Sequence, residues 1–254
     1  MIISDRKEFI FIHCRKTAGS SIKSYLNRYL GTLDVQTAAW HNAIKNGGSY
    51  NVRFWLDLLH PSIVFNPKTY KNIASEILLK NNIHKKLNEL HKKKYSYFVK
   101  PGHESAAEIK KHFPIEWESY YSFCFVRNPY KKVVSDYIWR VKQSGIDVSF
   151  LEFLREIDKS SPTSSKELTP KWPSNWPLYT IDDKVVVDRV GKFENLADDF
   201  EFICSQIDVE FVPDELPRAK KVKDYSYKEY YNKDAYKIVS SLYSNEIEYF
   251  GYSF

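Results

Sequence analysis

The stretch FIFIHCRKTAGSSIKSYL, residues 9–26, begins as an apolar run, breaks into a polar loop and then continues at helical spacing. Residues 8–13 are mostly β-branched and aromatic, which predicts a buried strand. From Ser20 onward apolar side chains recur at i, i+3, i+4, i+7 and i+8, and Gly31 is a stop signal, which together predict a helix. The stretch therefore predicts a strand, a loop and a helix.

The loop has the features of an anion site. A turn between a strand and a helix exposes backbone N–H groups at the positive end of the helix dipole, where anions bind. Lys16 adds a cation, and Ser20 and Ser21 add hydroxyl groups. However, the Walker A pattern GxxxxGK[ST] has its lysine after the second glycine, whereas Lys16 comes three residues before Gly19. An ordinary ATP loop is not indicated, and the loop alone favours a plain turn with a surface lysine.

The rest of the chain alternates between strand and helix patterns. Further strands are predicted at residues 95–100, 120–127 and 185–193, and helices at 105–113, 129–142 and 233–250. Residues 38–94 read as a helical insertion after the first strand and helix, on the side of the substrate. We expect an α/β fold, with three α/β/α layers around a mainly parallel central sheet. A chain of 254 residues fits a single domain, residues 1–254.

Composition sets broad limits on location and partners. The net charge of +6 favours an anionic ligand, although it is also common on indifferent surfaces. Cys14, Cys124 and Cys204 are too far apart to indicate a disulfide framework or a metal site. No apolar run reaches the roughly 20 residues of a membrane span, and residues 1–13 lack a signal-peptide pattern. We expect a cytoplasmic, bacterial protein without a transmembrane segment, although a chain trimmed of its anchor would look the same.

A second phosphate motif follows the strand at 120–127. Arg127 ends that strand, and Ser135 lies eight residues later in the next helix, so a guanidinium and a hydroxyl can bind one phosphate. The alternative is an exposed arginine and an ordinary helix serine. Together the two motifs resemble those of the PAPS-dependent sulfotransferases, in particular the carbohydrate (family 2-like) branch with bacterial members. Residues 103–113, 120–130, 187–203 and 243–254 extend this resemblance.

The resemblance implies a P-loop-containing fold and an activity. The enzyme would move a sulfuryl group from 3′-phosphoadenosine 5′-phosphosulfate (PAPS) to a hydroxyl of a glycan, leaving PAP as the product. Lys16 would stabilise negative charge on the leaving oxygen, and this chemistry requires no metal. The residues implied to bind the nucleotide are Arg15, Lys16, Thr17, Ala18, Gly19, Ser20, Ser21, Arg127, Ser135, Lys220, Lys221 and Lys223. For the last three lysines, a solvated charge run is the alternative.

A hydroxyl acceptor also needs a general base. His103 is the first choice, because it lies just past the predicted strand at 95–100, at the end of a sheet where ligands collect. Glu104 is the second choice. His103 is equally compatible with capping the helix near Ser105, and His13, at a strand end beside the loop, is assigned a structural role.

Two other classes of protein compete with this interpretation. A kinase-like P-loop phosphotransferase would bind ATP and Mg²⁺, but its GK[ST] motif is missing. A non-enzymatic basic module would bind an acidic polymer, yet no nucleic-acid-binding pattern appears, so nucleic acid is not expected. The sequence names neither the acceptor nor the oligomeric state.

Overall fold

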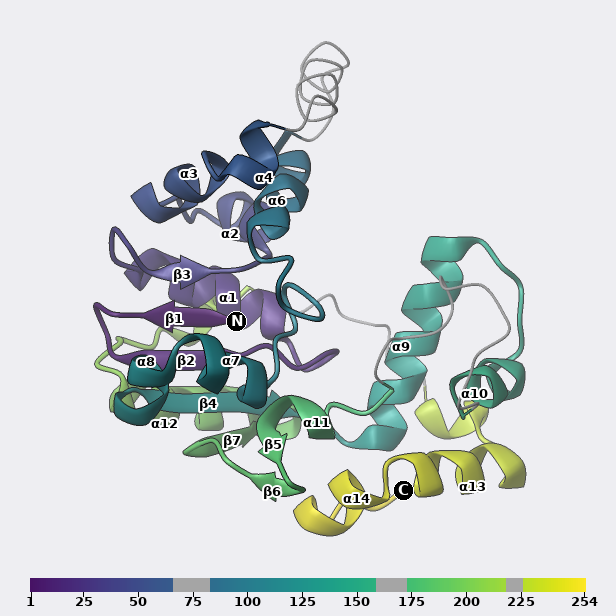
Figure 1. Ribbon diagram of the computed structural model, residues 1–254. Coiled ribbons are helices and arrows are strands. Elements are labelled where there is room, and N and C mark those ends of the chain that lie inside the picture. Colours follow the sequence, from purple (N-terminus) through teal and green to yellow (C-terminus); the bar gives the residue numbers. More distant parts are fainter. Residues whose placement is uncertain (66–82, 159–172, 218–225) are drawn as a thin grey trace. The chain divides into compact units, whose positions relative to one another are not determined.

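The computed structural model describes residues 1–65, 83–158, 173–217 and 226–254 (Figure 1). The chain divides into two compact units. The first joins Met1–Phe125 to Leu178–Ala219, and the second joins Val126–Pro177 to Lys220–Phe254. Each unit has its own hydrophobic core. The single domain expected for residues 1–254 stays a prediction.

The first unit is built on a five-stranded sheet with the order β3-β1-β2-β4-β7. The strands are β1 (Ile2–Ser4), β2 (Phe9–Ile12), β3 (Val35–Gln36), β4 (Tyr121–Val126) and β7 (Arg189–Lys192). At the centre β2 pairs in parallel with β4, whereas β1 runs antiparallel to both β2 and β3. The predicted strands at 8–13 and 120–127 are confirmed. The sequence does not predict the antiparallel edge, because two- and three-residue strands show no alternation.

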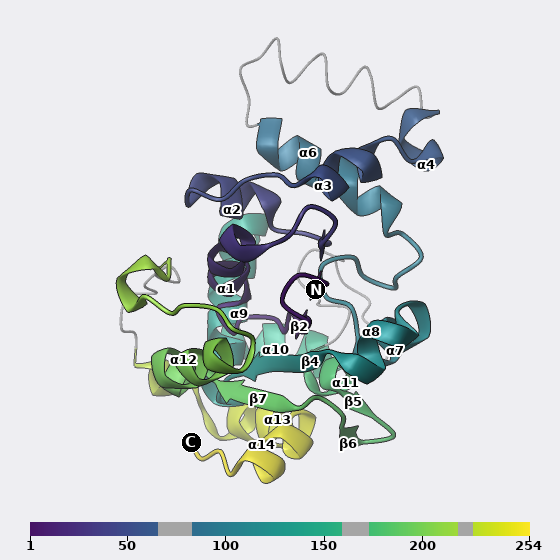
Figure 2. The same cartoon turned by 90° about the vertical axis from the view of Figure 1, so that its left-hand side faces the viewer.

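Helices cover both faces of this sheet (Figures 1 and 2). On one face lie α1 (Gly19–Leu26), which 3₁₀ turn η1 (Asn27–Tyr29) extends, and α12 (Leu196–Gln206). Their buried side chains share one core with those of the strands, including Phe9, Phe11, Ile22, Phe123, Phe125, Phe200 and Ile203. On the other face lie α7 (Ala106–His112) and α8 (Pro114–Ser119). The predicted three-layer arrangement is therefore present in the first unit.

The helices of residues 38–94 lie beyond β3, at one edge of the sheet (Figures 1 and 2). In the described part these are α2 (Trp40–Lys45), α3 (Val52–Leu58), α4 (Pro61–Val64) and α6 (Ile83–Lys94). The Asn51 side chain caps α3 by accepting a hydrogen bond from the N–H of Phe54 at 3.0 Å. α6 packs against α2, α3 and α4. The described part of the segment is helical, and the insertion at 38–94 with its role on the substrate side stays a prediction.

The strand predicted at residues 95–100 is wrong. The chain leaves α6 in turns, in which the N–H groups of Tyr95 and Phe98 bond to carbonyls three residues earlier. Tyr95 and Phe98 are buried whereas Tyr97 is exposed, so the buried residues recur at a spacing of three. A strand would bury every second residue. The helix that follows begins as predicted, with a capping box between Ser105 and Glu108.

The strand predicted at residues 185–193 is divided in two. β5 (Thr180–Ile181) and β6 (Lys184–Val185) form a small hairpin, and β7 joins the main sheet. Between β6 and β7, the carboxylate of Asp188 accepts hydrogen bonds from the N–H and the hydroxyl of Ser122, at 2.8 and 2.6 Å. This polar anchor interrupts the strand.

The second unit is helical in its described residues. Its main helices are α9 (Pro129–Ser144), α10 (Phe150–Asp158), α13 (Lys233–Leu242) and α14 (Ser244–Phe250). The remaining short helices of the described residues are α11 (Trp176–Tyr179), η2 (Phe193–Asn195), η3 (Pro213–Glu215) and η4 (Tyr227–Tyr230). Asn128 caps α9, which begins where the sequence predicts, and the helix predicted at 233–250 is interrupted at Tyr243. Among the described helices, none has the length and apolar character needed to span a bilayer.

Candidate active site

The loop between β2 and α1 has an unusual backbone. Lys16 and Ala18 both adopt the left-handed conformation, with φ of 63° and 62°. For a residue other than glycine, the left-handed conformation costs on the order of 1 kcal/mol or more. The surrounding structure must therefore hold the loop in place. One restraint is the hydroxyl of Thr17, which donates a hydrogen bond to the carbonyl of Cys14 at 3.1 Å. Left-handed residues within such a turn direct successive N–H groups into a concavity that binds anions.

The start of α1 belongs to the same concavity. Ala18 is the residue before the helix, and no side chain caps the first turn. The N–H groups of Ser21 and Ile22 bond to the carbonyl of Ala18, at 2.8 and 3.1 Å. The N–H groups before them have no acceptor within the helix, as at any helix start. An exposed hydroxyl at Ser20 and a half-buried Lys16 lie beside these donors.

Residue 19 must be glycine because the side chain of His13 lies close to it, and not because of its own backbone conformation. A Cβ atom at this position would lie 1.9 Å from Cδ2 of His13, which is far inside contact distance. The imidazole of His13 therefore packs directly on the first turn of α1. Any side chain at residue 19 would displace either the ring or the loop.

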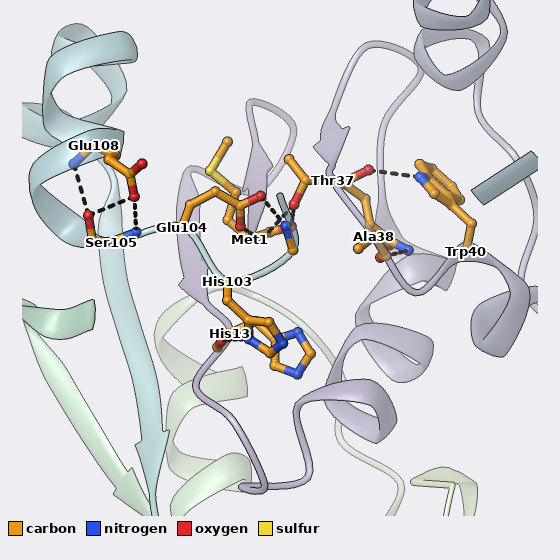
Figure 3. Close-up of polar contacts among 11 residues, drawn as sticks. Met1, His13, Thr37, Ala38, Trp40, His103, Glu104, Ser105 and Glu108 are labelled. Atoms are coloured by element: carbon orange, nitrogen blue, oxygen red, sulfur yellow. Dashed lines mark hydrogen bonds and ion pairs between the residues drawn. The ribbon is translucent and has the colours of Figure 1, made fainter. Parts of the chain in front are cut away.

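His103 lies against His13 (Figure 3). The ring centroids are 4.6 Å apart, and Nδ1 of His103 is 2.8 Å from the carbonyl oxygen of His13. Because a carbonyl only accepts, Nδ1 of His103 carries the hydrogen, and the lone pair of the neutral ring lies on Nε2. Burial lowers the pKa of His103 to about 3, and the nearby charges of Lys100, Arg15 and Lys23 act in the same direction. The pKa of His13 is also held well below its usual value, first by burial and then by electrostatic repulsion from the neighbouring His103.

Glu104 points away from these rings into a buried ionic cluster (Figure 3). Its carboxylate accepts hydrogen bonds from the amino group of Met1 and from the N–H of Gly102, each at 2.5 Å. The same amino group donates to the hydroxyl of Thr37 at 2.8 Å. Burial alone would raise the pKa of Glu104, but the positive charges of Met1 and Lys23 lower it below the usual range. Glu104 is therefore held as a paired, fully buried carboxylate.

Lys23 supplies a second positive charge close to Glu104, besides the amino group of Met1. It lies on α1, four residues after Gly19, and its side chain is completely buried. Among the described residues its Nζ atom has no hydrogen-bond partner, and burial lowers its pKa to about 8. Lys23 is not among the predicted site residues, since a lysine in an amphipathic helix is normally a surface residue.

The comparison with protein families decides the class. The family model described as "Sulfotransferase family" matches residues 1–253, nearly the whole chain. The chain belongs to the Sulfotransferase family. Membership supports sulfuryl transfer over the two competing interpretations, a phosphotransferase and a non-enzymatic basic module.

Other relatives add little detail about this sulfotransferase. An uncharacterized protein of Archaeoglobus fulgidus is 32% identical over 107 residues, which is 39% of this chain and 75% of that protein. No solved structure matches the chain. The acceptor and the donor therefore have to be argued from the residues themselves.

The predicted second phosphate motif lies in the second unit. Arg127 directly precedes Asn128, whose side chain accepts a hydrogen bond from the N–H of Tyr130 at 3.0 Å and donates one to the carbonyl of Ser253 at 2.9 Å. Ser135 is buried on α9, one turn past the buried Lys132. Arg127 and Ser135 are thus placed at the start of one well-anchored helix.

The remaining predicted nucleotide-binding residues have different outcomes. Arg15 is buried beside the loop, within the first unit. Lys220, Lys221 and Lys223 lie outside the described residues. Within the first unit the structure brings together the loop, His13 and His103, and no local sequence pattern indicates the contact between His13 and Gly19.

Proposed function

We propose that this sulfotransferase transfers a sulfuryl group from PAPS to a hydroxyl of a carbohydrate acceptor. The observation that carries the proposal is the concavity of backbone N–H groups at the start of α1, where Lys16 and Ala18 are left-handed and no side chain caps the helix. We call this concavity the anion cradle. The neutral imidazole of His103 belongs to the same unit, and it touches His13, which packs on that helix start. An anion site and a proton acceptor are the two groups that this transfer needs.

The cradle would hold the donor end of PAPS. The N–H groups and hydroxyls of residues 15–21 would bind the oxygens of the 5′ phosphate and the sulfate, and the charge of Lys16 would meet the charge that grows on the leaving oxygen. Because these groups are fixed before the substrate binds, they need little reorganisation in the transition state. Arg127 and Ser135 would bind the 3′-phosphate, and Lys220, Lys221 and Lys223, outside the described residues, would also bind the nucleotide.

His103 would take the proton of the acceptor. The acceptor oxygen forms a bond to sulfur, the bond between sulfur and the 5′-phosphate oxygen breaks, and the hydroxyl proton passes to Nε2 of His103. The hydrogen bond from Nδ1 to the carbonyl of His13 fixes the tautomer for this role. The low pKa of His103 keeps the ring neutral, and the negative charge of bound PAPS would raise that pKa and strengthen the base.

Glu104 fits a supporting role better than a catalytic one. Its two oxygens are engaged by Met1 and by Gly102, and the side chain is completely buried. The bond to Gly102 fixes the turn that carries His103. The geometry therefore favours His103 over Glu104 as the base.

The test combines nucleotide binding with transfer. Thermal shifts would be measured with PAP, with ADP, which lacks the 3′-phosphate, and with ATP plus Mg²⁺; a ligand that binds only the folded state raises the melting temperature. We expect PAP to stabilise most, and transfer of ³⁵S from labelled PAPS to appear with glycans in a panel that also contains phenols and lipids. If ATP and Mg²⁺ stabilised the protein and PAP did not, PAPS would be refuted as the donor. Transfer to phenols or lipids alone would refute the acceptor.

A further inference from the structure

Helix α3 buries Phe54 but carries other large apolar side chains on a side that faces solvent. Val52, Trp55, Leu56 and Leu59 follow one another at i, i+3, i+4 and i+7, and they are 49, 50, 51 and 69% exposed. We call these four residues the α3 stripe. A helix of a water-soluble domain normally turns such a stripe toward the core. Phe65, at the end of α4, is also exposed, at 82%.

The opposite face of α3 is held by a buried polar network. The carboxylate of Asp57 accepts hydrogen bonds from Nε of Arg53 at 2.9 Å and from the hydroxyl of Tyr95 at 2.5 Å. Nε2 of His91, on α6, is 3.1 Å from the same carboxylate. Rolling α3 inward to bury its stripe would break this network and leave the buried side chains of His91 and Tyr95 without their hydrogen-bond acceptor, which is unfavourable. The hydrogen bonds of Asp57 therefore keep the α3 stripe exposed in the folded protein.

The same segment holds the positive charge of the chain. Residues 38–94 contain ten lysines and arginines against three acidic residues, a net charge of +7, whereas the rest of the chain has a net charge of −1. Of the acidic residues described there, Asp57 is buried and Glu89 is paired with Lys92. α6, which packs against α3 and α4, carries the lysines Lys85, Lys86, Lys92, Lys93 and Lys94.

We propose that α3, α4 and α6 dock on an anionic lipid bilayer, with the α3 stripe and Phe65 in the interface and the lysines of α6 among the headgroups. Exposed Trp, Leu and Phe at helical spacing beside lysines are typical of helices that lie on membranes. Lysines near an anionic leaflet add further attraction. A second copy of the chain would bring the same charge of +7 and repel, and an acidic polysaccharide would leave the aliphatic part of the stripe uncovered. This proposal does not depend on the proposed acceptor.

Vesicle sedimentation of the full chain tests the docking. We expect binding to vesicles of phosphatidylcholine with 30% phosphatidylglycerol, weaker binding at higher salt, and little binding to phosphatidylcholine alone. Leu59→Glu and Phe65→Glu should each weaken binding about tenfold or more, because each removes one large apolar side chain from the interface. Trp139→Glu and Ile115→Glu are the matched controls, since these side chains are 47 and 80% exposed outside residues 38–94, and both should bind like the wild type.

Charge reversal gives a second, independent measurement. The double variant Lys92→Glu/Lys93→Glu should lose binding, whereas Lys110→Glu/Lys111→Glu on α7 should retain it. The two pairs are matched, because Lys92 and Lys110 each have one ion-pair partner, Glu89 and Glu118.

Three results would overturn the proposal. The first is no binding of the wild type to the anionic vesicles at low salt. The second is equal loss in stripe and control variants whose circular dichroism and melting temperatures match the wild type. The third is a dimer, seen by sedimentation equilibrium without lipid, that Leu59→Glu dissociates, since the stripe would then be covered by a second copy of the chain.

Discussion

Nδ1 of His103 donates a hydrogen bond to the backbone carbonyl of His13 at 2.8 Å, and the two rings lie 4.6 Å apart. This one contact connects the end of β2 to the turn that carries the proposed base. It also fixes which nitrogen of His103 can accept a proton. Since His13 packs on Gly19, the position of the base and the shape of the anion cradle are linked.

Replacing the base should separate binding from chemistry. In His103→Ala we expect PAP to raise the melting temperature as in the wild type, while the transfer rate falls by about 10²–10⁴-fold, the usual contribution of a general base. Thermal shift and ³⁵S transfer measure the two effects. His112→Ala, at the exposed end of α7, is the control and should keep full activity. Unimpaired turnover in His103→Ala would exclude His103 as the base.

The same histidines should make stability depend on pH. The pKa of His103 is lowered to about 3 and that of His13 is lowered as well, so in mild acid the unfolded chain binds protons at both rings that the folded chain does not. Stability should therefore fall as the pH drops below about 6.5, by up to about 1.4 kcal/mol per pH unit for each ring. Urea unfolding between pH 7.5 and 5 measures this slope. His103→Ala should show a smaller slope, and an unchanged slope would contradict burial of a neutral ring.

Lys16 should act on the transition state rather than on the fold. Removing a preorganised group that stabilises developing charge costs about 10²–10³-fold in kcat, so we expect that loss in Lys16→Ala. The melting temperature without ligand should not change, because Lys16 is only half-buried. Lys142→Ala, an exposed lysine on α9, is the control for loss of one positive charge. Wild-type transfer in Lys16→Ala would refute the cradle as the catalytic site.

Arg127 should report on the 3′-phosphate alone. In Arg127→Ala we expect PAP to bind about 10–100-fold more weakly, since a hydrogen bond to a charged group is worth about 1.5–3 kcal/mol. ADP, which lacks the 3′-phosphate, should bind equally to the variant and the wild type. Titration calorimetry with both nucleotides measures this, with Arg155→Ala on the exposed side of α10 as the control. Equal weakening for PAP and ADP would show that Arg127 does not bind the 3′-phosphate.

Strands and helix starts that depend on a local sequence pattern are predicted correctly. The strand at 8–13 and the starts of the helices at 105–113 and 129–142 follow from neighbouring residues, and the structure has each of them. Features that depend on tertiary contacts could not be predicted from the sequence, because no local pattern indicates which residues meet. The burial of Glu104 depends on Met1, and the need for glycine at residue 19 depends on a ring six positions earlier. The strand predicted at 95–100 failed because its aromatic side chains pack around turns that follow a helix.

The contact between Gly19 and His13 gives the sharpest test of this site. Gly19→Ala would place a methyl group against the ring, and we expect a loss of about 1–3 kcal/mol in unfolding free energy, together with weaker PAP binding. His13→Ala removes the ring, so the double variant should be more stable than the sum of the two single losses predicts, by about 0.5–3 kcal/mol. Urea unfolding of all four proteins measures this coupling. Strictly additive losses would mean that the ring and the loop do not touch. Recovery of PAP binding in the double variant, without recovery of transfer, would show that the cradle and the base are separable parts of one site.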